Sequence, residues 1–404
     1  MLRQEEIARV IDSQQEYFQG KDQGLIRESL SKIPIVESYA TIITGLRRCG
    51  KSTLLLQLMN QKNQNAIYLN FEDIRLIAFE PSDFPRLYSE IKQRAVQVIF
   101  FDEVQLIEKW EIFVNQLLRE GFFVFVTGSN ASLLSGELGT HLTGRHLSME
   151  LFPFSYQEFI SFTSSAVSYE SLEAYLKIGG IPEFVKSKNE LIIAALLDDI
   201  LVKDIAVRHG IRDVASLKQL ALYLLSNLGV PTSANKLVGM FGIKSAVTIL
   251  DFFSYFQNSY LMDFVPQFSY SLKAQNRNPK KVYALDLGLA TAVSTSFSEN
   301  NGRKLENLIY LHLRRKYNSI HYFTEKGECD FVVSEKGKVT HAIQVCYQIS
   351  DENFSREYKG LLQALDFFNL EIGWIVTANQ RDRFEESGKT VELIPAFEFI
   401  TMEL

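Results

Sequence analysis

The sequence predicts an α/β protein that begins with a parallel sheet domain and ends with a smaller, separate α/β domain. Between residue 40 and about residue 150, short apolar runs alternate with helical stretches. From about 151 to 265 the hydrophobic periodicity is nearly all helical, and from about 305 the pattern is mixed again. Continuous apolar strands separated by helices are typical of a parallel sheet that helices cover on both faces.

Four apolar runs are the predicted strands of the first domain, and residues 1–35 before them have the pattern of an amphipathic helix broken near Gly20 and Gly24. The strands are Ala40–Thr44, Ala66–Asn70, Val98–Phe101 and Phe122–Thr127. Each is apolar along its length, as expected for a strand that is buried on both faces.

The composition narrows the class of protein. The 404 residues predict two to three domains, and the net charge of -6 excludes a global cationic field, so any nucleic-acid contact must come from a local patch. The cysteines are Cys49, Cys329 and Cys346, an odd number without a CxxC pair, which favours a reducing compartment. The N-terminus is charged and no apolar run has the length of a membrane span. We expect a soluble cytoplasmic protein that does not enter the membrane.

A phosphate-binding motif follows the first predicted strand. The run Gly45-Leu-Arg-Arg-Cys-Gly-Lys-Ser52 fits GxxxxGK[ST] and precedes a predicted helix at Thr53–Met59. The glycines let consecutive N–H groups point at phosphate oxygens, and Lys51 adds a positive charge for the β- and γ-phosphates. We therefore expect ATP at Gly45, Leu46, Arg47, Arg48, Cys49, Gly50, Lys51, Ser52 and Thr53, with Mg²⁺ on the Ser52 hydroxyl.

Two acids end the third predicted strand. Asp102 is expected to hold Mg²⁺ and Glu103 to polarise the attacking water. The strand delivers these carboxylates to the carboxyl edge of the sheet, where ligands bind, and we expect it to be a neighbour of the phosphate-loop strand. The fourth strand ends in Thr127-Gly-Ser-Asn130, where Ser129 or Asn130 is a candidate contact for the γ-phosphate or the water. The alternative is a turn that caps the next helix.

The middle of the chain has the order of a winged helix, with three helices and then a β-pair. The expected helices are Ser216–Leu228, Thr232–Met240 and Ser245–Gln257, and the expected strands are Tyr260–Val265 and Lys281–Leu285. The segment that joins the strands is basic and aromatic without an acid, which favours contacts with DNA phosphates. The expected contact residues are Lys273, Arg277, Lys280 and Lys281. A protein partner remains the alternative, because the third helix is mostly apolar.

Together these motifs resemble AAA-superfamily ATPases, in particular a prokaryotic group that joins an AAA domain to a C-terminal domain of unknown function. The resemblance rests on Gly45–Ser52, Phe101–Glu103 with Gln105, Thr127–Asn130, Leu142–Arg145, Leu151–Phe159, Gly179–Glu183, and Asp204 with Arg208. It implies that Asn130 is the polar sensor and that Arg145 stabilises transition-state charge, in its own subunit or a neighbouring one. For Arg145, a surface ion pair or a hinge is the alternative. The oligomeric state is left open.

The C-terminal domain resembles the PD-(D/E)xK nuclease fold. We expect a helix at Lys304–Tyr317 that carries Glu306, a hairpin at 320–346, a helix at 354–368 and a strand at Ile372–Thr377. Asp330 and Gln344 lie on the hairpin, but Cys346 stands where the nuclease pattern has lysine. A mostly neutral thiol cannot replace an ammonium, so we expect no nuclease activity. An unrelated α/β domain is the alternative.

The predicted organisation is an ATPase core at 1–160, a helical lid at 161–215, a winged-helix-like domain at 216–290 and the nuclease-like domain at 291–404. The leading interpretation is an ATPase that hydrolyses ATP to change its contacts with DNA or a protein partner. A slow nucleotide-gated switch and an ATP-dependent Mg²⁺ nuclease are the alternatives. A small-molecule kinase fits the large additions poorly.

Overall fold

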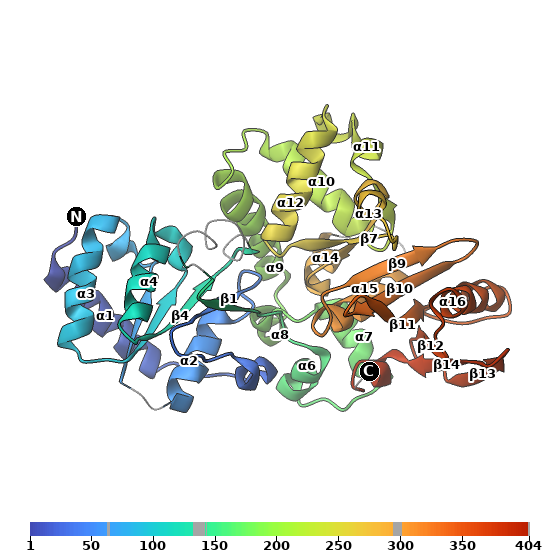
Figure 1. The fold of residues 1–404 in the computed structure, drawn as a ribbon, viewed down its shortest axis with the longest axis horizontal. Helices are drawn as coiled ribbons and strands as arrows, with labels where there is room; N and C mark the ends of the chain where they lie inside the picture. The colour runs from blue at the N-terminus through green and yellow to red at the C-terminus, as the bar shows by residue number, and fades with distance from the viewer. Residues whose placement is uncertain (63–64, 132–141, 143, 294–300, 403–404) are drawn as a thin grey trace. The chain divides into compact units, whose positions relative to one another are not determined.

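The computed structural model describes residues 1–62, 65–131, 142, 144–293 and 301–402 (Figure 1). The chain divides into two compact units. The first comprises Met1–Phe152 together with Asn258–Tyr260, and the second comprises Pro153–Gln257 and Leu261–Leu404. Thr143 of the Leu142–Arg145 motif, and the helix that the turn after Thr127 was expected to cap, lie outside the described residues.

A five-stranded parallel sheet forms the centre of the first unit, in the order β2-β3-β4-β1-β5. Its strands are β1 Ala40–Thr44, β2 Ala66–Asn70, β3 Val98–Asp102, β4 Phe123–Gly128 and β5 His146–Glu150. The four predicted strands are confirmed to within one residue. The edge strand β5 was not predicted, because its side chains are only partly buried and its sequence contains no continuous apolar run.

The order of the strands corrects one expectation. The phosphate-loop strand β1 and the acidic strand β3 are not neighbours, because β4 lies between them and pairs with both. Strands that are equally apolar carry no local signal of their order in the sheet. The carboxyl ends of all three strands still lie at one edge of the sheet, since the three strands are parallel.

Helices surround this sheet and complete its core. The helices are α1 Gln4–Gln19, α2 Lys51–Lys62, α3 Phe84–Gln93 and α4 Trp110–Arg119, with short 3₁₀ turns at Glu28–Lys32, Ile74–Leu76, Pro81–Asp83 and Val104–Leu106. Ile7 and Ile11 of α1 are fully buried in the same hydrophobic cluster as Ile67 of β2 and Ile99 of β3. Burying such a side chain contributes about 1.5–3 kcal/mol, so this apolar face accounts for the docking of α1.

The second unit begins with a helical segment that runs into a small three-stranded antiparallel sheet of order β6-β8-β7. The helices are α6 Tyr156–Thr163, α7 Tyr169–Ile178, α8 Pro182–Ser187, α9 Glu190–Asp199, a π-helical stretch at Ile200–Val207, α10 Val214–Ser226, α11 Ala234–Leu237, a 3₁₀ turn at Met240–Gly242, α12 Ala246–Asn258, α13 Leu272–Arg277 and α14 Leu287–Val293. The strands are β6 Pro231–Thr232, β7 Met262–Pro266 and β8 Lys280–Ala284.

Two details of this segment differ from the sequence expectation. The predicted helix Thr232–Met240 is reduced to the single turn α11, because Thr232 pairs with Lys280 in the sheet and the Ser233 side chain caps the helix that follows. The connection between β7 and β8, for which no element was predicted, contains the helix α13.

The chain ends in a six-stranded mixed sheet of order β13-β14-β12-β11-β10-β9. Its elements are α15 Asn301–Arg314, β9 Ile320–Thr324, β10 Glu328–Glu335, β11 Lys338–Val345, α16 Phe354–Phe368, β12 Ile372–Thr377, β13 Asp382–Glu386, β14 Lys389–Pro395 and α17 Ala396–Phe399. The predicted helix at 354–368 and the predicted strand at Ile372–Thr377 are confirmed. The predicted hairpin consists of three strands, because β9 also pairs with β10.

The motif Gly179–Glu183 has a packing role in the second unit. An added Cβ at Gly180 would lie 2.3 Å from the carbonyl oxygen of Phe154, and the Gly180 N–H donates to Asp286 Oδ2 at 2.7 Å. The N–H of Phe154 donates to the carbonyl oxygen of Gly180, also at 2.7 Å. The glycine therefore allows two backbone segments to approach more closely than any side chain permits.

Replacing Gly180 with alanine is expected to lower the free energy of unfolding by about 3 kcal/mol, because the new methyl group overlaps a backbone atom that cannot move alone. Gly302→Ala is the matched control, since nothing lies within 4 Å of its Cβ position and it lies in α15. Urea unfolding of both variants measures the difference. Equal stability of the two variants would contradict the close approach at Gly180.

Candidate functional site

The phosphate loop joins the end of β1 to the start of α2, which begins at Lys51. Gly45 has a φ of 152°, and an added Cβ would lie 2.1 Å from the carbonyl oxygen of Leu151. The backbone of the chain beyond β5 therefore occupies the space that a side chain at position 45 would need. The first N–H groups of a helix have no partner within the helix, so the start of α2 favours an anion beside the loop.

The Lys51 side chain lies within the curve of this loop. Its Nζ donates to the carbonyl oxygens of Gly45 at 3.1 Å and Leu46 at 3.2 Å, and lies 3.7 Å from Glu103 Oε1. The residue is only 5% exposed. Its charge is thus held between the loop and the end of β3, where the sequence places the phosphates.

Asp102, at the end of β3, is fully buried among hydroxyl groups. Its carboxylate accepts hydrogen bonds from Tyr68 Oη at 2.7 Å and from Thr127 Oγ1, and Ser52 is also a side-chain partner. Burial raises the pKa of Asp102, and the charge of Glu103 raises it further. A carboxylate and a hydroxyl in contact are oxygen ligands of the kind that Mg²⁺ takes, so these two residues fit the expected ion.

Thr127, the residue before the end of β4, positions both acids. Its Oγ1 donates to Asp102 and accepts the backbone N–H of Glu103 at 3.1 Å. Glu103 has a left-handed backbone with φ 52°, which is uncommon for a residue with a side chain and is often found at functional sites. Gln105, which the resemblance singles out, donates through Nε2 to Glu103 Oε2 at 2.5 Å.

Four other predicted site residues lie in the phosphate loop or directly after β4. Ser129 and Asn130 are both 2% exposed and follow β4, whose Gly128 is in register with Thr44 just before the phosphate loop. Arg47 forms an ion pair with Glu72 at 3.5 Å, whereas the Arg48 side chain is exposed.

Arg145 is not brought to the phosphate loop of its own chain. It precedes β5, where His146 is in register with Ala40, at the opposite end of β1 from the loop. The four residue steps from Ala40 to Thr44 span about 13 Å of strand, which is more than an arginine side chain can reach.

Sequence reasoning missed one residue that supports the loop. The buried Arg27 guanidinium donates to the carbonyl oxygen of Cys49 at 2.8 Å and to that of Phe152 at 2.7 Å. The Cys49 thiol in turn donates to Leu151 O at 3.3 Å, and burial raises its pKa. No motif spacing connects residue 27 to the loop, so this contact has no signal in the sequence.

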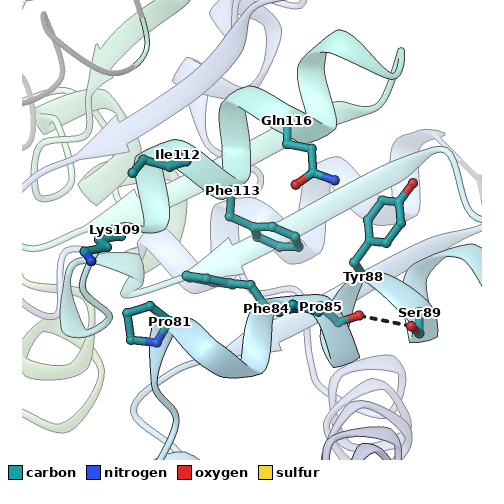
Figure 2. A pocket seen from close by; sticks show the side chains of 9 residues that line it. All are labelled: Pro81, Phe84, Pro85, Tyr88, Ser89, Lys109, Ile112, Phe113 and Gln116. Carbon is teal, nitrogen blue, oxygen red and sulfur yellow. Dashed lines mark hydrogen bonds between the residues drawn. The ribbon is translucent and has the colours of Figure 1, made fainter.

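A cavity of about 530 Å³ lies between α3 and α4, and none of the predicted nucleotide-site residues lines it. Figure 2 shows Phe84 and Phe113 facing one another in its wall, with ring centroids 4.5 Å apart. The lining is mainly apolar, so it does not offer the donors that phosphate needs.

Three of the four basic residues predicted to contact DNA reach the surface, but Lys281 does not. Lys273 and Arg277 are exposed and Lys280 is half-buried, but Lys281 is 2% exposed and its ammonium pairs with carboxylates. The expectation that Lys281 contacts DNA phosphates is therefore wrong. Its place in the alternating pattern of β8 turns its side chain to the opposite face from that of Lys280.

The structure brings the C-terminal candidates together. Gln344 Oε1 accepts from the backbone N–H of Asp330 at 3.1 Å, and its Nε2 donates to Glu357 Oε2 at 2.5 Å. The Cys346 thiol donates to the carbonyl oxygen of Gln348 at 3.2 Å, and burial raises the pKa of Cys346 to about 11. The thiol is thus neutral near pH 7, as the sequence argument requires.

Two kinds of feature are absent from the described part of the chain. No helix there is long and apolar enough to cross a membrane. Nor do those residues contain a group of three or more histidine, cysteine, aspartate or glutamate side chains placed to hold a metal ion.

The fold and the loop define a protein with an AAA domain. A family described as "AAA domain" matches residues 37–160, and a domain of unknown function, DUF8612, matches residues 169–300. The second match shows a domain of unknown function directly after the AAA domain, and neither match reaches residues 301–404.

Two relatives match over most of their length. An uncharacterized protein of Methanocaldococcus jannaschii, MJ1544, is 32% identical over 399 residues, which cover 90% of this chain and 88% of the relative. An uncharacterized protein of Haemophilus influenzae is 30% identical over 351 residues, which cover 81% of this chain and 87% of the relative. The chain belongs to the family of these proteins. Among solved structures, a mutant of Thermotoga maritima RuvB matches with a TM-score of 0.30 and 14% identity, over 66% of this chain and 91% of that one.

Proposed function

We propose that this protein binds ATP with Mg²⁺ and hydrolyses it, and that hydrolysis changes its contacts with DNA or with a protein partner. The observation that carries the proposal is the convergence of Lys51, Asp102 and Glu103 at one edge of the sheet, with Thr127 bonded to both acids. These are the charges and oxygen ligands that phosphoryl transfer to water requires.

Each residue has a distinct part in the proposed reaction. Lys51 exchanges its bonds to the Gly45 and Leu46 carbonyls for the β- and γ-phosphates, and the loop N–H groups orient the same phosphates. Ser52 and Asp102 would hold the metal, which would supply positive charge beside the phosphates. Glu103 polarises the attacking water, and Thr127 fixes its backbone so that the carboxylate is held beside the loop.

Asn130 and Arg145 complete the proposal in different ways. Asn130 follows the strand next to the phosphate loop and is our candidate for contacting the γ-phosphate or the water. Arg145 lies at the far end of β5, which favours action on the site of a neighbouring copy of the chain over action on its own. The proposal for Arg145 therefore entails an oligomer. An ion pair on the surface is its alternative role.

The segment 216–290 is the proposed contact module, with the order of a winged helix. Lys273, Arg277 and Lys280 near the exposed side chain of Tyr270 favour contacts with a phosphate backbone. A protein partner is favoured instead by α12, on which Val247 and Leu250 are 67% and 53% exposed. The DNA-binding measurement that closes this subsection distinguishes a DNA partner from a protein partner.

The other functions that the sequence allows are less well supported. A slow nucleotide-gated switch needs no water-polarising acid, yet Glu103 is held beside Lys51. A Mg²⁺ nuclease at Glu306 and Asp330 is opposed by the neutral Cys346 thiol and by the bonding of Lys281 to both of these acids.

Glu103→Gln is expected to keep ATP binding and to lower the turnover number at least about tenfold, because it retains the shape and removes the base. Phosphate release at saturating ATP measures turnover, and calorimetry measures binding. Glu108→Gln, the same change at an exposed acid five residues on, is the control and is expected to have wild-type turnover. Lys51→Ala is expected to lose ATP binding. Wild-type turnover in Glu103→Gln would remove this residue from the mechanism.

Replacing Lys273, Arg277 and Lys280 together with glutamate is expected to abolish DNA binding. The affinity of the wild type is expected to fall with salt, by a log–log slope of roughly -0.9 for each duplex phosphate contacted. The matched control carries the same charge change at the exposed Lys32, Lys186 and Lys359. Absence of duplex binding by the wild type at low salt, with and without ATP, would assign the segment to a protein partner.

A further inference from the structure

Lys281 on β8 is one of the most deeply buried charged residues of the second unit, and it is surrounded by acids. Its Nζ lies 2.7 Å from Asp330 Oδ1, 2.7 Å from Glu328 Oε1 and 3.1 Å from Glu306 Oε1. We refer to these three acids, Glu306, Glu328 and Asp330, as the carboxylate cluster. They come from α15 and β10, far along the chain from β8.

The cluster is also held in place by neutral donors. Tyr283 Oη donates to Glu306 Oε1 at 2.6 Å, and the backbone N–H of Val345 donates to Asp330 Oδ2 at 2.9 Å. The Glu306 carboxylate is thus bonded by two residues of β8, and the second oxygen of Asp330 is held by β11. The Lys281 ammonium also lies 5.7 Å from the centre of the Tyr322 ring, whose face attracts a cation.

The electrostatics of the cluster require a cation. Burial raises the pKa of Glu306 to about 7, and the charge of Asp330 contributes to this rise. For Lys281, burial lowers the pKa, but the carboxylates outweigh burial and hold it well above its usual value. Without Lys281, the buried carboxylates of Glu306 and Asp330 would repel one another with nothing to compensate their charge.

Three carboxylate oxygens lie within 3.1 Å of the Lys281 ammonium. The ammonium donates hydrogen bonds to Asp330 Oδ1 and Glu306 Oε1, and Glu328, whose side chain is 44% exposed, adds an ion pair. The distances are those of N–H···O bonds, whereas Mg²⁺ would require oxygens at about 2.0–2.1 Å.

We propose that the carboxylate cluster is a cation site whose ligand is the Lys281 ammonium of the same chain. In this role Lys281 ties the small sheet of β8 to the C-terminal mixed sheet and keeps the cluster closed to divalent metal ions. The proposal is independent of ATP hydrolysis, because no residue of the phosphate loop takes part. It gives the basic stretch 273–281 two roles, with the last residue turned inward and the others exposed or half-buried.

The test compares the melting temperatures of a set of variants of the full-length chain, measured by calorimetry. Lys281→Met keeps most of the side-chain length and removes the charge, so its melting temperature is expected to fall by roughly 6–20 °C. Lys280→Met, next to it on β8 and half-buried, is the control and is expected to change little. A Lys280→Met loss as large as that of Lys281→Met would overturn the proposal.

The double variant Lys281→Met/Asp330→Asn separates charge from packing. The amide that Asp330→Asn introduces still accepts from Val345 through its oxygen, and its NH₂ group donates to the remaining acids. We expect Asp330→Asn to lower the melting temperature of the wild type and to raise that of Lys281→Met, or to restore soluble folded protein if Lys281→Met alone does not fold. An Asp330→Asn effect of the same sign and size in both backgrounds, or no rescue of folding, would overturn the proposal.

A titration with Mn²⁺ alone, without nucleotide, tests the closed state directly. Wild type and Asp330→Asn are expected to bind Mn²⁺ identically by electron paramagnetic resonance, because the cluster already holds its cation. Saturable Mn²⁺ binding by the wild type that Asp330→Asn removes would show a metal site and overturn the proposal. Neither result depends on whether the chain hydrolyses ATP.

Discussion

The position of β4 between β1 and β3 is the constraint on which the candidate nucleotide site depends. It separates the phosphate-loop strand from the acidic strand by two strand spacings, roughly 10 Å, and places Thr127 between them. From there one hydroxyl group bonds the Asp102 carboxylate and the Glu103 N–H, while Lys51 extends from the loop toward Glu103.

Two buried groups of acids in this protein differ in what compensates their charge. The partners of Asp102 that contact its oxygens are hydroxyl groups, so burial raises its pKa and a cation at this position would favour its ionised form. The Asp330 group contains its own cation, Lys281, which donates to Asp330 and Glu306 and also forms an ion pair with Glu328. The buried Asp102 group would thus gain from an added cation, whereas the Asp330 group already has one.

The sequence predicted local features well and spatial neighbours poorly. Apolar runs located β1 to β4, and the spacing of Gly45, Gly50 and Lys51 located the loop, because both signals are contained in a few consecutive residues. Strand order, the Arg27 contact with Cys49 and the burial of Lys281 depend on residues tens of positions apart, and a sequence pattern does not encode such distances. In the sequence Lys281 has the same basic character as Lys273 and Arg277. Its role depends on which face of β8 its side chain extends from.

The central claim is that the edge formed by β1, β4 and β3 hydrolyses ATP. The most direct measurement is the release of ADP and phosphate from ATP by the purified full-length chain, with Mg²⁺ and with a chelator in its place. The claim predicts release of the two products in equal amounts, with Mg²⁺ and not with the chelator. Binding of ATP with Mg²⁺ but without any release of phosphate would contradict it.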